Sequence, residues 1–374
     1  MERVTELLER FHSIAASPEK QLEKYFKQGK QVIACAPVYT PEEIIHSMGL
    51  VPFGVWGADM ELEKAKSYFP AFICSVTQSI LELGMAGQYE GISAIVIPSL
   101  CDSLKCLGQN WKYAVPDIPF IPMTYPQNRN SEGGIAFAVA GYKRVIRDLE
   151  EITGKRFDED SLVKSNNIYN THNAVMREVS DLLGEHPSIT AIQRSEIFKS
   201  AYFMTKEEHT SLVKEFIEQL IKSPEEKKNK IRVITSGILA DNSSLLSVLD
   251  DNNIQIVGDD IAHESRQYRI DSKSGDSALD SLARKFSNMG NCSVLFDADK
   301  KRSEFITDMV KSKNASAVLM IMTKFCDPEE FDYVIIRKAC EKANISCLQI
   351  EIDRQMVNYE QAKTMIQTFS ENIQ

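Results

Sequence analysis

The sequence predicts an α/β protein with two doubly wound parallel-sheet domains, each Rossmann-like, joined by a helical connecting region. Short apolar runs alternate with helical stretches from residue 31 and again from residue 230, which is the rhythm of parallel βαβ units. Residues 133–220 carry helical patterning without a clear strand. A chain of 374 residues also exceeds what one hydrophobic core usually organises. The predicted division is 1–30 (N-terminal helical segment), 31–150 (first α/β domain), 151–229 (helical bridge) and 230–374 (second α/β domain).

In the first half, apolar residues at helical spacing predict one or two amphipathic helices before residue 30, packed on the first domain or on a partner. The next helix is expected to begin with Thr40 as its cap, Pro41 in its first turn and Glu43 at the capping-box position. Gly49 is expected to end it, and another helix should begin at or near Cys74. Extended runs are expected at residues 31–36, 50–56, 94–98 and 118–123.

The second half repeats this order. Strands are expected at residues 231–237, 254–260, 317–323 and 346–352. Helices are expected at residues 243–249, 278–289 and 303–310, after Pro328, and from residue 358 onward. In open α/β sheets, sites form at the carboxyl ends of the strands. The crevice between the two domains is therefore the predicted site.

Composition excludes several classes of function. The formal net charge of -10 and the pI near 5.3 argue against nucleic acid or an anionic membrane as a partner. No apolar stretch approaches the roughly 20 residues needed to cross a bilayer, and the charged start does not resemble a signal peptide. A cytoplasmic location with reduced thiols is therefore expected. Glycine-rich phosphate loops and the Gly-x-Ser-x-Gly elbow are absent from the sequence.

Three of the eight cysteines fall at the ends of predicted elements. Cys74 begins a helix, and Cys101 and Cys326 each follow a strand and precede an aspartate. Exposed backbone N–H groups at such positions stabilise thiolate, the metal-binding form. Soft thiolates favour an iron–sulfur cluster or zinc, and three of them would leave one iron of a [4Fe–4S] cluster to a non-protein ligand. Zinc could use Cys101 with Cys106, whereas the remaining cysteines are expected to be buried, namely Cys35, Cys292, Cys340 and Cys347.

Acidic pairs offer weaker evidence for catalysis. Asp259 and Asp260 end a predicted strand and could act as acid and base, pair with Arg266, or cap a helix. Glu43 has the same ambiguity, because a capping box explains it without catalysis. The catalytic residue is therefore unassigned, with Glu43 as the candidate.

Together, several segments resemble the 2-hydroxyacyl-CoA dehydratase family, which also contains benzoyl-CoA reductase subunits. The resemblance is carried in order along nearly the whole chain by residues 39–52, the helix start at Cys74, and residues 99–105, 256–266 and 324–332. The family's pattern usually continues in lysines after the second cysteine, whereas this chain has Lys105 followed by Cys106. For this reason Cys106 remains an alternative to Cys101.

The resemblance implies a β subunit that pairs with an α subunit of similar fold in a heterodimer. It implies one [4Fe–4S] cluster held by Cys74, Cys101 and Cys326, with a non-protein fourth ligand. An ATP-hydrolysing iron–sulfur activator would inject one electron, and a ketyl radical of the thioester would then expel the hydroxyl group. In this way (R)-2-hydroxyacyl-CoA, with 2-hydroxyisocaproyl-CoA favoured, would become (E)-2-enoyl-CoA in an oxygen-sensitive lyase of amino-acid fermentation. If the chain is instead an α subunit, Glu43 becomes a polar contact of the substrate.

Two other functions remain open from the residues alone. One is a benzoyl-CoA reductase-like or double-cubane reductase subunit, which would differ in its products. The other is a metal-free or zinc-bound structural subunit, for which substitution of Cys74, Cys101 and Cys326 would leave the cofactor content unchanged.

Overall fold

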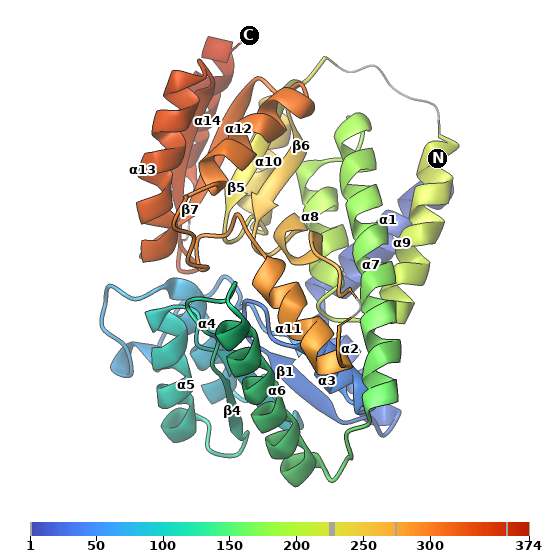
Figure 1. The fold of residues 1–374 in the computed structure, drawn as a ribbon. Helices are drawn as coiled ribbons and strands as arrows, with labels where there is room; N and C mark the ends of the chain where they lie inside the picture. Colours follow the sequence, from blue (N-terminus) through green and yellow to red (C-terminus); the bar gives the residue numbers. More distant parts are fainter. Residues whose placement is uncertain (1, 224–228, 274, 357, 374) are drawn as a thin grey trace.

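The computed structural model describes residues 2–223, 229–273, 275–356 and 358–373. These residues form two four-stranded parallel sheets surrounded by helices, which confirms the predicted α/β class with two Rossmann-like sheets (Figure 1). The first sheet has the order β2-β1-β3-β4, with β1 at Val32–Cys35, β2 at Val51–Gly54, β3 at Ala94–Pro98 and β4 at Phe120–Met123. The second has the order β6-β5-β7-β8, with β5 at Ile231–Gly237, β6 at Ile254–Ile261, β7 at Ala317–Thr323 and β8 at Ser346–Ile352.

The two sheets have equivalent strand orders. In each, the first strand of the half lies inside the sheet, and the strand order reverses beside it. Strands β1, β3 and β7 are buried along their whole length, as expected for apolar parallel strands covered on both faces. The reversal points lie between β1 and β3 and between β5 and β7, where an open α/β sheet has its crevice.

Helices cover the sheets and fill the segment between them. The helices of the first half are α1 (Glu2–Ala16), α2 (Pro18–Lys27), α3 (Glu42–Ser47), α4 (Ser75–Met85), α5 (Asp102–Ala114) and α6 (Glu132–Thr153). The connecting helices are α7 (Glu159–Glu185), α8 (Ala191–Ser200) and α9 (Lys206–Ile221). The second half contributes α10 (Ser243–Asp251), α11 (Ala278–Asn288), α12 (Arg302–Ser312), α13 (Asp327–Lys342) and α14 (Glu360–Ile373). Two short 3-10 turns complete the described elements, η1 (Ala65–Ser67) and η2 (Ser265–Tyr268).

The N-terminal helix α1 packs against α8 and α9 of the connecting segment, and α2 lies beside β1. Phe11 anchors α1 there, because its buried ring makes an edge contact with Phe216 of α9. None of the described helices is both long and apolar enough to cross a membrane.

The predicted start of α3 is wrong in one detail. The residue that precedes the helix is Pro41, and no side chain caps it. The hydroxyl of Thr40 instead donates to the carbonyl of Ala36, 2.7 Å away, which holds the loop after β1. Glu43 is therefore not part of a capping box. Gly49 follows the end of α3 with a φ of +73°, a left-handed conformation that suits glycine, as predicted.

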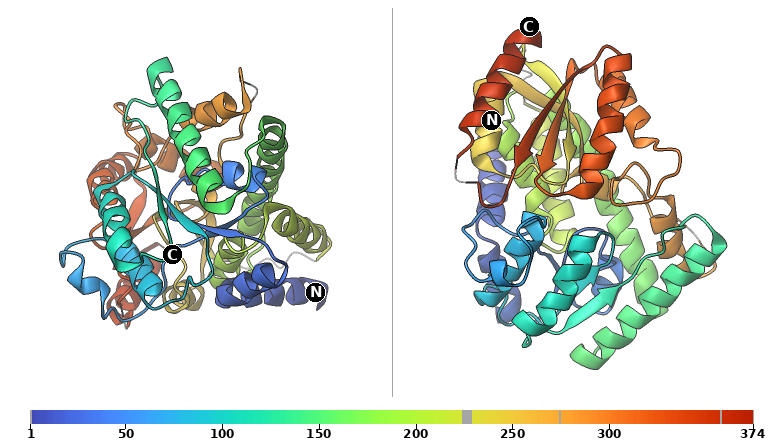
Figure 2. Two further views of the ribbon diagram at one scale, coloured as in Figure 1. Left: turned by 90° about the horizontal axis from the view of Figure 1, so that it is seen from below. Right: turned by 90° about the vertical axis from the view of Figure 1, so that its left-hand side faces the viewer.

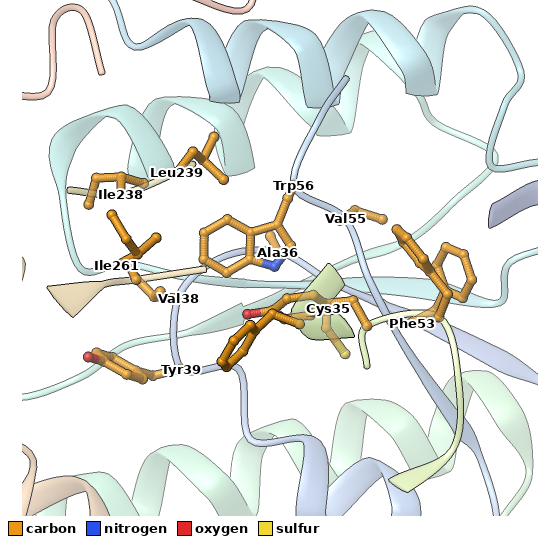
Figure 3. Close-up of a cluster of buried hydrophobic side chains, with 14 of the residues drawn as sticks. Cys35, Ala36, Val38, Tyr39, Phe53, Val55, Trp56, Ile238, Leu239 and Ile261 are labelled. Atoms are coloured by element: carbon orange, nitrogen blue, oxygen red, sulfur yellow. The ribbon is translucent and has the colours of Figure 1, made fainter. Parts of the chain in front are cut away.

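The two halves share one continuous apolar core. In the right-hand view of Figure 2 the second half lies above the first, and Figure 3 shows Trp56 and Val38 of the first half facing Ile238 and Ile261 of the second. Helix α7 contacts α3 in the first half and β6 in the second, and α11 packs on α6. Packing from both halves therefore fixes the crevice between the two sheets.

Candidate functional site

A cavity of about 500 Å³ lies where the carboxyl ends of the two sheets meet. Its walls include residues that follow four inner strands: Val38 after β1, Cys101 after β3, Ile238 after β5 and Cys326 after β7. The structure therefore places the cavity at the reversal points of both sheets at once. This is the crevice where the sequence predicts the site.

All three cysteines predicted as ligands line this cavity. Each one is the residue that directly precedes a helix: Cys74 before α4, Cys101 before α5 and Cys326 before α13. Three helix N-termini with their partial positive charge therefore converge on one cavity. Cys101 and Cys326 occupy equivalent places, because β3 and β7 are equivalent strands in the two sheets.

The thiols are close enough to influence one another. The pKa of Cys101 is raised to about 12, mainly by burial and in addition by the neighbouring Cys74, while the N–H of Leu104 opposes both. Burial also raises the pKa of Cys326 well above its ordinary value, with Cys74 and Cys101 contributing. Burial raises the pKa of Cys74 too, against hydrogen bonds from the backbone N–H groups of α4. Cys326 is buried and Cys74 and Cys101 are half-buried, and three neighbouring thiols of this kind need a cation to become thiolates together.

The other cysteines lie elsewhere. Cys106 is exposed on α5 and is not among the residues that line the cavity. Cys35, Cys292 and Cys340 are buried, as predicted, and Cys347 is half-buried.

Glu43 lies away from the cysteine cavity. It is buried, and its carboxylate binds the ammonium group of Lys285 on α11 at 2.5 Å. Both residues line a second, smaller cavity. Glu43 therefore forms an ion pair between the two halves in place of the predicted capping box.

The acidic pair at the end of β6 belongs to a buried ion-pair network. Asp260 accepts hydrogen bonds from Arg266 at 3.1 Å and from Arg302 at 2.8 Å. Asp259 binds Arg194 at 2.5 Å. Of the roles considered for these carboxylates, the structure shows ion pairing, including the expected pair with Arg266.

Several residues of the cavity were not identified from the sequence. Pro37 and Val38 follow β1, so the strand-end argument that found Cys101 could have found them. The loop residues Ser293 and Phe296 also line the cavity, but they follow no strand and carry no motif. Phe296 and Phe331 are 60% and 76% exposed, so an aromatic rim borders the cavity.

The donor set has the chemistry that an iron–sulfur cluster takes, because three cysteine thiols line one cavity. Among the described residues, no group of three or more His, Cys, Asp or Glu side chains is arranged to hold one metal ion. The three thiols instead surround a cavity of about 500 Å³. In an iron–sulfur cluster each thiolate binds a different iron, so the sulfur ligands stand apart around the cluster.

Comparison with known proteins gives full-length matches. The family model described as 2-hydroxyglutaryl-CoA dehydratase, D-component, matches residues 37–373. The chain is 48% identical over 366 residues to the (R)-phenyllactyl-CoA dehydratase β subunit of Clostridium sporogenes, covering 97% of both chains. It is 38% identical to the lactoyl-CoA dehydratase β subunit of Anaerotignum propionicum, over 99% of this chain and 100% of that one. It is 36% identical to the (R)-2-hydroxyglutaryl-CoA dehydratase β subunit of Acidaminococcus fermentans, with the same coverage. The chain therefore belongs to the 2-hydroxyglutaryl-CoA dehydratase D-component family, whose members named here are dehydratase β subunits.

Proposed function

We propose that this chain is the iron–sulfur β subunit of an (R)-2-hydroxyacyl-CoA dehydratase. Cys74, Cys101 and Cys326 would hold one [4Fe–4S] cluster, with a non-protein group as the fourth ligand. The observation that carries the proposal is the convergence of these three thiols, each at a helix N-terminus, on one cavity between the two sheets. Soft thiolate donors of this kind are typical of iron–sulfur clusters.

The chain's own residues would prepare the site in two ways. Backbone N–H groups donate to the sulfurs, those of Val76 and Thr77 to Cys74 and that of Glu329 to Cys326, which favours the negative charge of bound thiolates. Apolar walls that include Val38 and Trp56 limit the water around the site. When bound, the cluster would supply one-electron chemistry.

The proposed reaction removes water from (R)-2-hydroxyacyl-CoA and gives (E)-2-enoyl-CoA through a ketyl radical of the substrate. The relatives are named β subunits, which supports an α subunit as the partner in a heterodimer. An ATP-hydrolysing activator would deliver the electron, consistent with the absence of a phosphate-binding loop in this chain. For the acyl group we propose 2-hydroxyisocaproyl-CoA, with phenyllactyl-CoA as the alternative that the 48% identical relative favours.

The test is the iron and acid-labile sulfide content of the chain purified without oxygen together with its partner subunit. We expect about four of each per chain. Cys101→Ala should lose the cluster, whereas Cys106→Ala, the matched control five residues along, should keep it. Zinc without sulfide, or unchanged metal content in Cys74→Ala, Cys101→Ala and Cys326→Ala, would refute the proposal and favour a structural subunit.

The reaction is tested separately. The complete enzyme with its activator is incubated with (R)-2-hydroxyisocaproyl-CoA, (R)-phenyllactyl-CoA and benzoyl-CoA, and the products are identified by mass spectrometry. A 2-enoyl-CoA product supports the dehydratase. A ring-reduced product from benzoyl-CoA would instead identify a reductase.

A further inference from the structure

Two cysteines outside the cysteine cavity meet at the C-terminal end of α13. Cys340 lies in the last turn of this helix, whereas the proposed cluster ligand Cys326 directly precedes its first residue. Cys347 is the second residue of β8. Neither Cys340 nor Cys347 is among the residues that line the cysteine cavity. A role for this pair therefore does not depend on a bound cluster.

The turn between α13 and β8 brings the two side chains to one face of the second sheet. The N–H of Ile345 donates to the carbonyl of Cys340 at 2.9 Å, so the chain reverses directly beside this cysteine. Cys347 pairs in register with Val318 of β7, and paired residues of neighbouring strands point to the same face of a sheet. Val318 and Cys340 belong to one buried apolar cluster, against which Cys347 packs. Cys347 therefore points toward α13 and Cys340.

The two thiols share a hydrogen bond. This bond lowers the pKa of Cys340 and raises that of Cys347, as expected for two acidic groups that titrate as a pair. The pair as a whole therefore releases its first proton more readily than an isolated thiol does. Thiolate is the form of cysteine that attacks disulfides. Two sulfur atoms in hydrogen-bond contact also need only a small side-chain movement to reach the S–S distance of about 2.0 Å.

The two cysteines differ in their exposure. Cys340 is 0% exposed, whereas Cys347 is half-buried. Cys347 also lies on the last strand in the order of the second sheet, where β8 pairs with β7 alone among the described strands. A small reagent therefore reaches Cys347 first, and Cys340 stands behind it as the thiol that can displace the reagent.

We propose that Cys340 and Cys347 form a redox-active dithiol site, which a low-molecular-weight disulfide converts into an intramolecular disulfide. The thiolate of Cys347 attacks one sulfur of the reagent, which forms a mixed disulfide and releases one small thiol. Cys340 then attacks the sulfur of Cys347, forms the bond between the two cysteines and releases the second small thiol. Two electrons pass from the cysteines to the reagent, and the two protons that the cysteines lose end on the released thiols.

The test treats the chain, in complex with its partner subunit and without oxygen, with 2-hydroxyethyl disulfide and then alkylates the remaining thiols. Trypsin cleaves after lysine and arginine, so Cys340 and Cys347 fall in separate peptides, residues 339–342 and 343–354. We expect mass spectrometry without reduction to find these two peptides joined, and dithiothreitol to separate them. Cys106, which is exposed, is the control and should carry the reagent as a mixed disulfide.

Two variants separate the roles of the cysteines. In Cys340→Ala, Cys347 should keep the reagent as a stable mixed disulfide, because no second thiol displaces it. In Cys347→Ala, Cys340 should remain a free thiol because it is buried. Modification of Cys340 in that variant would contradict the entry of the reagent at Cys347.

Two results in the wild type would overturn the proposal. One is that both cysteines remain free while Cys106 is modified, as expected of thiols that only fill the core. The other is that Cys347 carries the reagent beside a free Cys340. The iron content of the same samples reports separately on the proposed cluster, and we expect the two peptides to be joined whether or not iron is present.

Discussion

Glu264 is a buried carboxyl group that shares one guanidinium group with a second carboxylate. Arg194 contacts both Glu264 and Asp259, and all three side chains are almost fully buried. Burial and, to a smaller extent, the nearby Asp259 raise the pKa of Glu264 to about 7 against the attraction of Arg194. One cation therefore does not neutralise both carboxylates, and Glu264 retains its proton into the neutral range.

This arrangement predicts a pH-dependent stability. An unfolded glutamate has a pKa of about 4.3, so between about pH 4.3 and 7 the folded state keeps a proton that the unfolded state has lost. The free energy of unfolding should fall as the pH rises through this window, by up to about 1.4 kcal/mol per pH unit from this group. Glu264→Gln cannot ionise and should remove that slope. Urea unfolding of the wild type and the variant at pH 5 and pH 7 measures this slope. An unchanged slope in the variant would contradict the raised pKa of Glu264.

At the scale of an element, the buried carboxylate of Glu329 holds the first turn of α13 in place through hydrogen bonds. Glu329 accepts hydrogen bonds from Arg302 at 2.9 Å and from Ser293 at 2.7 Å, and it is 0% exposed. The same turn begins at Cys326, whose sulfur receives the N–H of Glu329. The buried network therefore positions the helix end that carries one of the three thiols.

Removal of this carboxylate should destabilise the protein and loosen that end of α13. Glu329→Ala leaves Arg302 with less compensating charge in the interior, which typically costs about 3–5 kcal/mol. Glu330→Ala removes the exposed glutamate of the same turn and should change the free energy of unfolding by less than about 0.5 kcal/mol. Denaturant unfolding compares the two variants, and the iron retained after purification shows whether Cys326 is still positioned. Equal losses of unfolding free energy in both variants would refute the proposal that the buried network positions this end of α13.

At the scale of the whole molecule, the sequence predicts what local patterns determine. The apolar runs predict the strands, and the rule that sites lie at strand ends selects Cys101 and Cys326, which the structure places on one cavity. The same patterns did not reveal that Glu43 binds Lys285, because the partners are 242 residues apart and meet only when the halves pack together. The expectation that Thr40 caps α3 is wrong for a related reason, since its hydroxyl donates to the carbonyl of Ala36 in the loop after β1.

Arg354, which follows β8, makes polar contacts with both halves. Its guanidinium group binds the buried Asp241 at 2.9 Å, and it also reaches Asp59 and the carbonyl of Trp56 in the first half. Its backbone N–H donates to the hydroxyl of Ser75, next to Cys74. One residue of the second half therefore holds the wall of the cysteine cavity that the first half provides.

Arg354→Met should consequently weaken the whole molecule, and the effect should depend on pH. Burial would raise the pKa of Asp241, but Arg354 and Lys199 hold it well below its usual range. The stability from this pairing is fully present above the unfolded pKa of about 3.9 and is lost gradually as the pH falls from there towards the much lower folded pKa. The variant should therefore lose about 3–5 kcal/mol at pH 7, and the difference from the wild type should become smaller only below about pH 4.

The matched control is Arg3→Met, because Arg3 is half-exposed and its ion pairs with Glu6 and Glu215 lie at the surface. Its loss should cost no more than about 1 kcal/mol at either pH. Denaturant unfolding of both variants at pH 7 and at about pH 3 gives the comparison. If Arg354→Met were no more destabilised than Arg3→Met, the junction would depend on the shared apolar core around Trp56 rather than on charge. A large loss of unfolding free energy that becomes smaller at acidic pH would instead show that Arg354 holds the two halves, and the three thiols between them, in position.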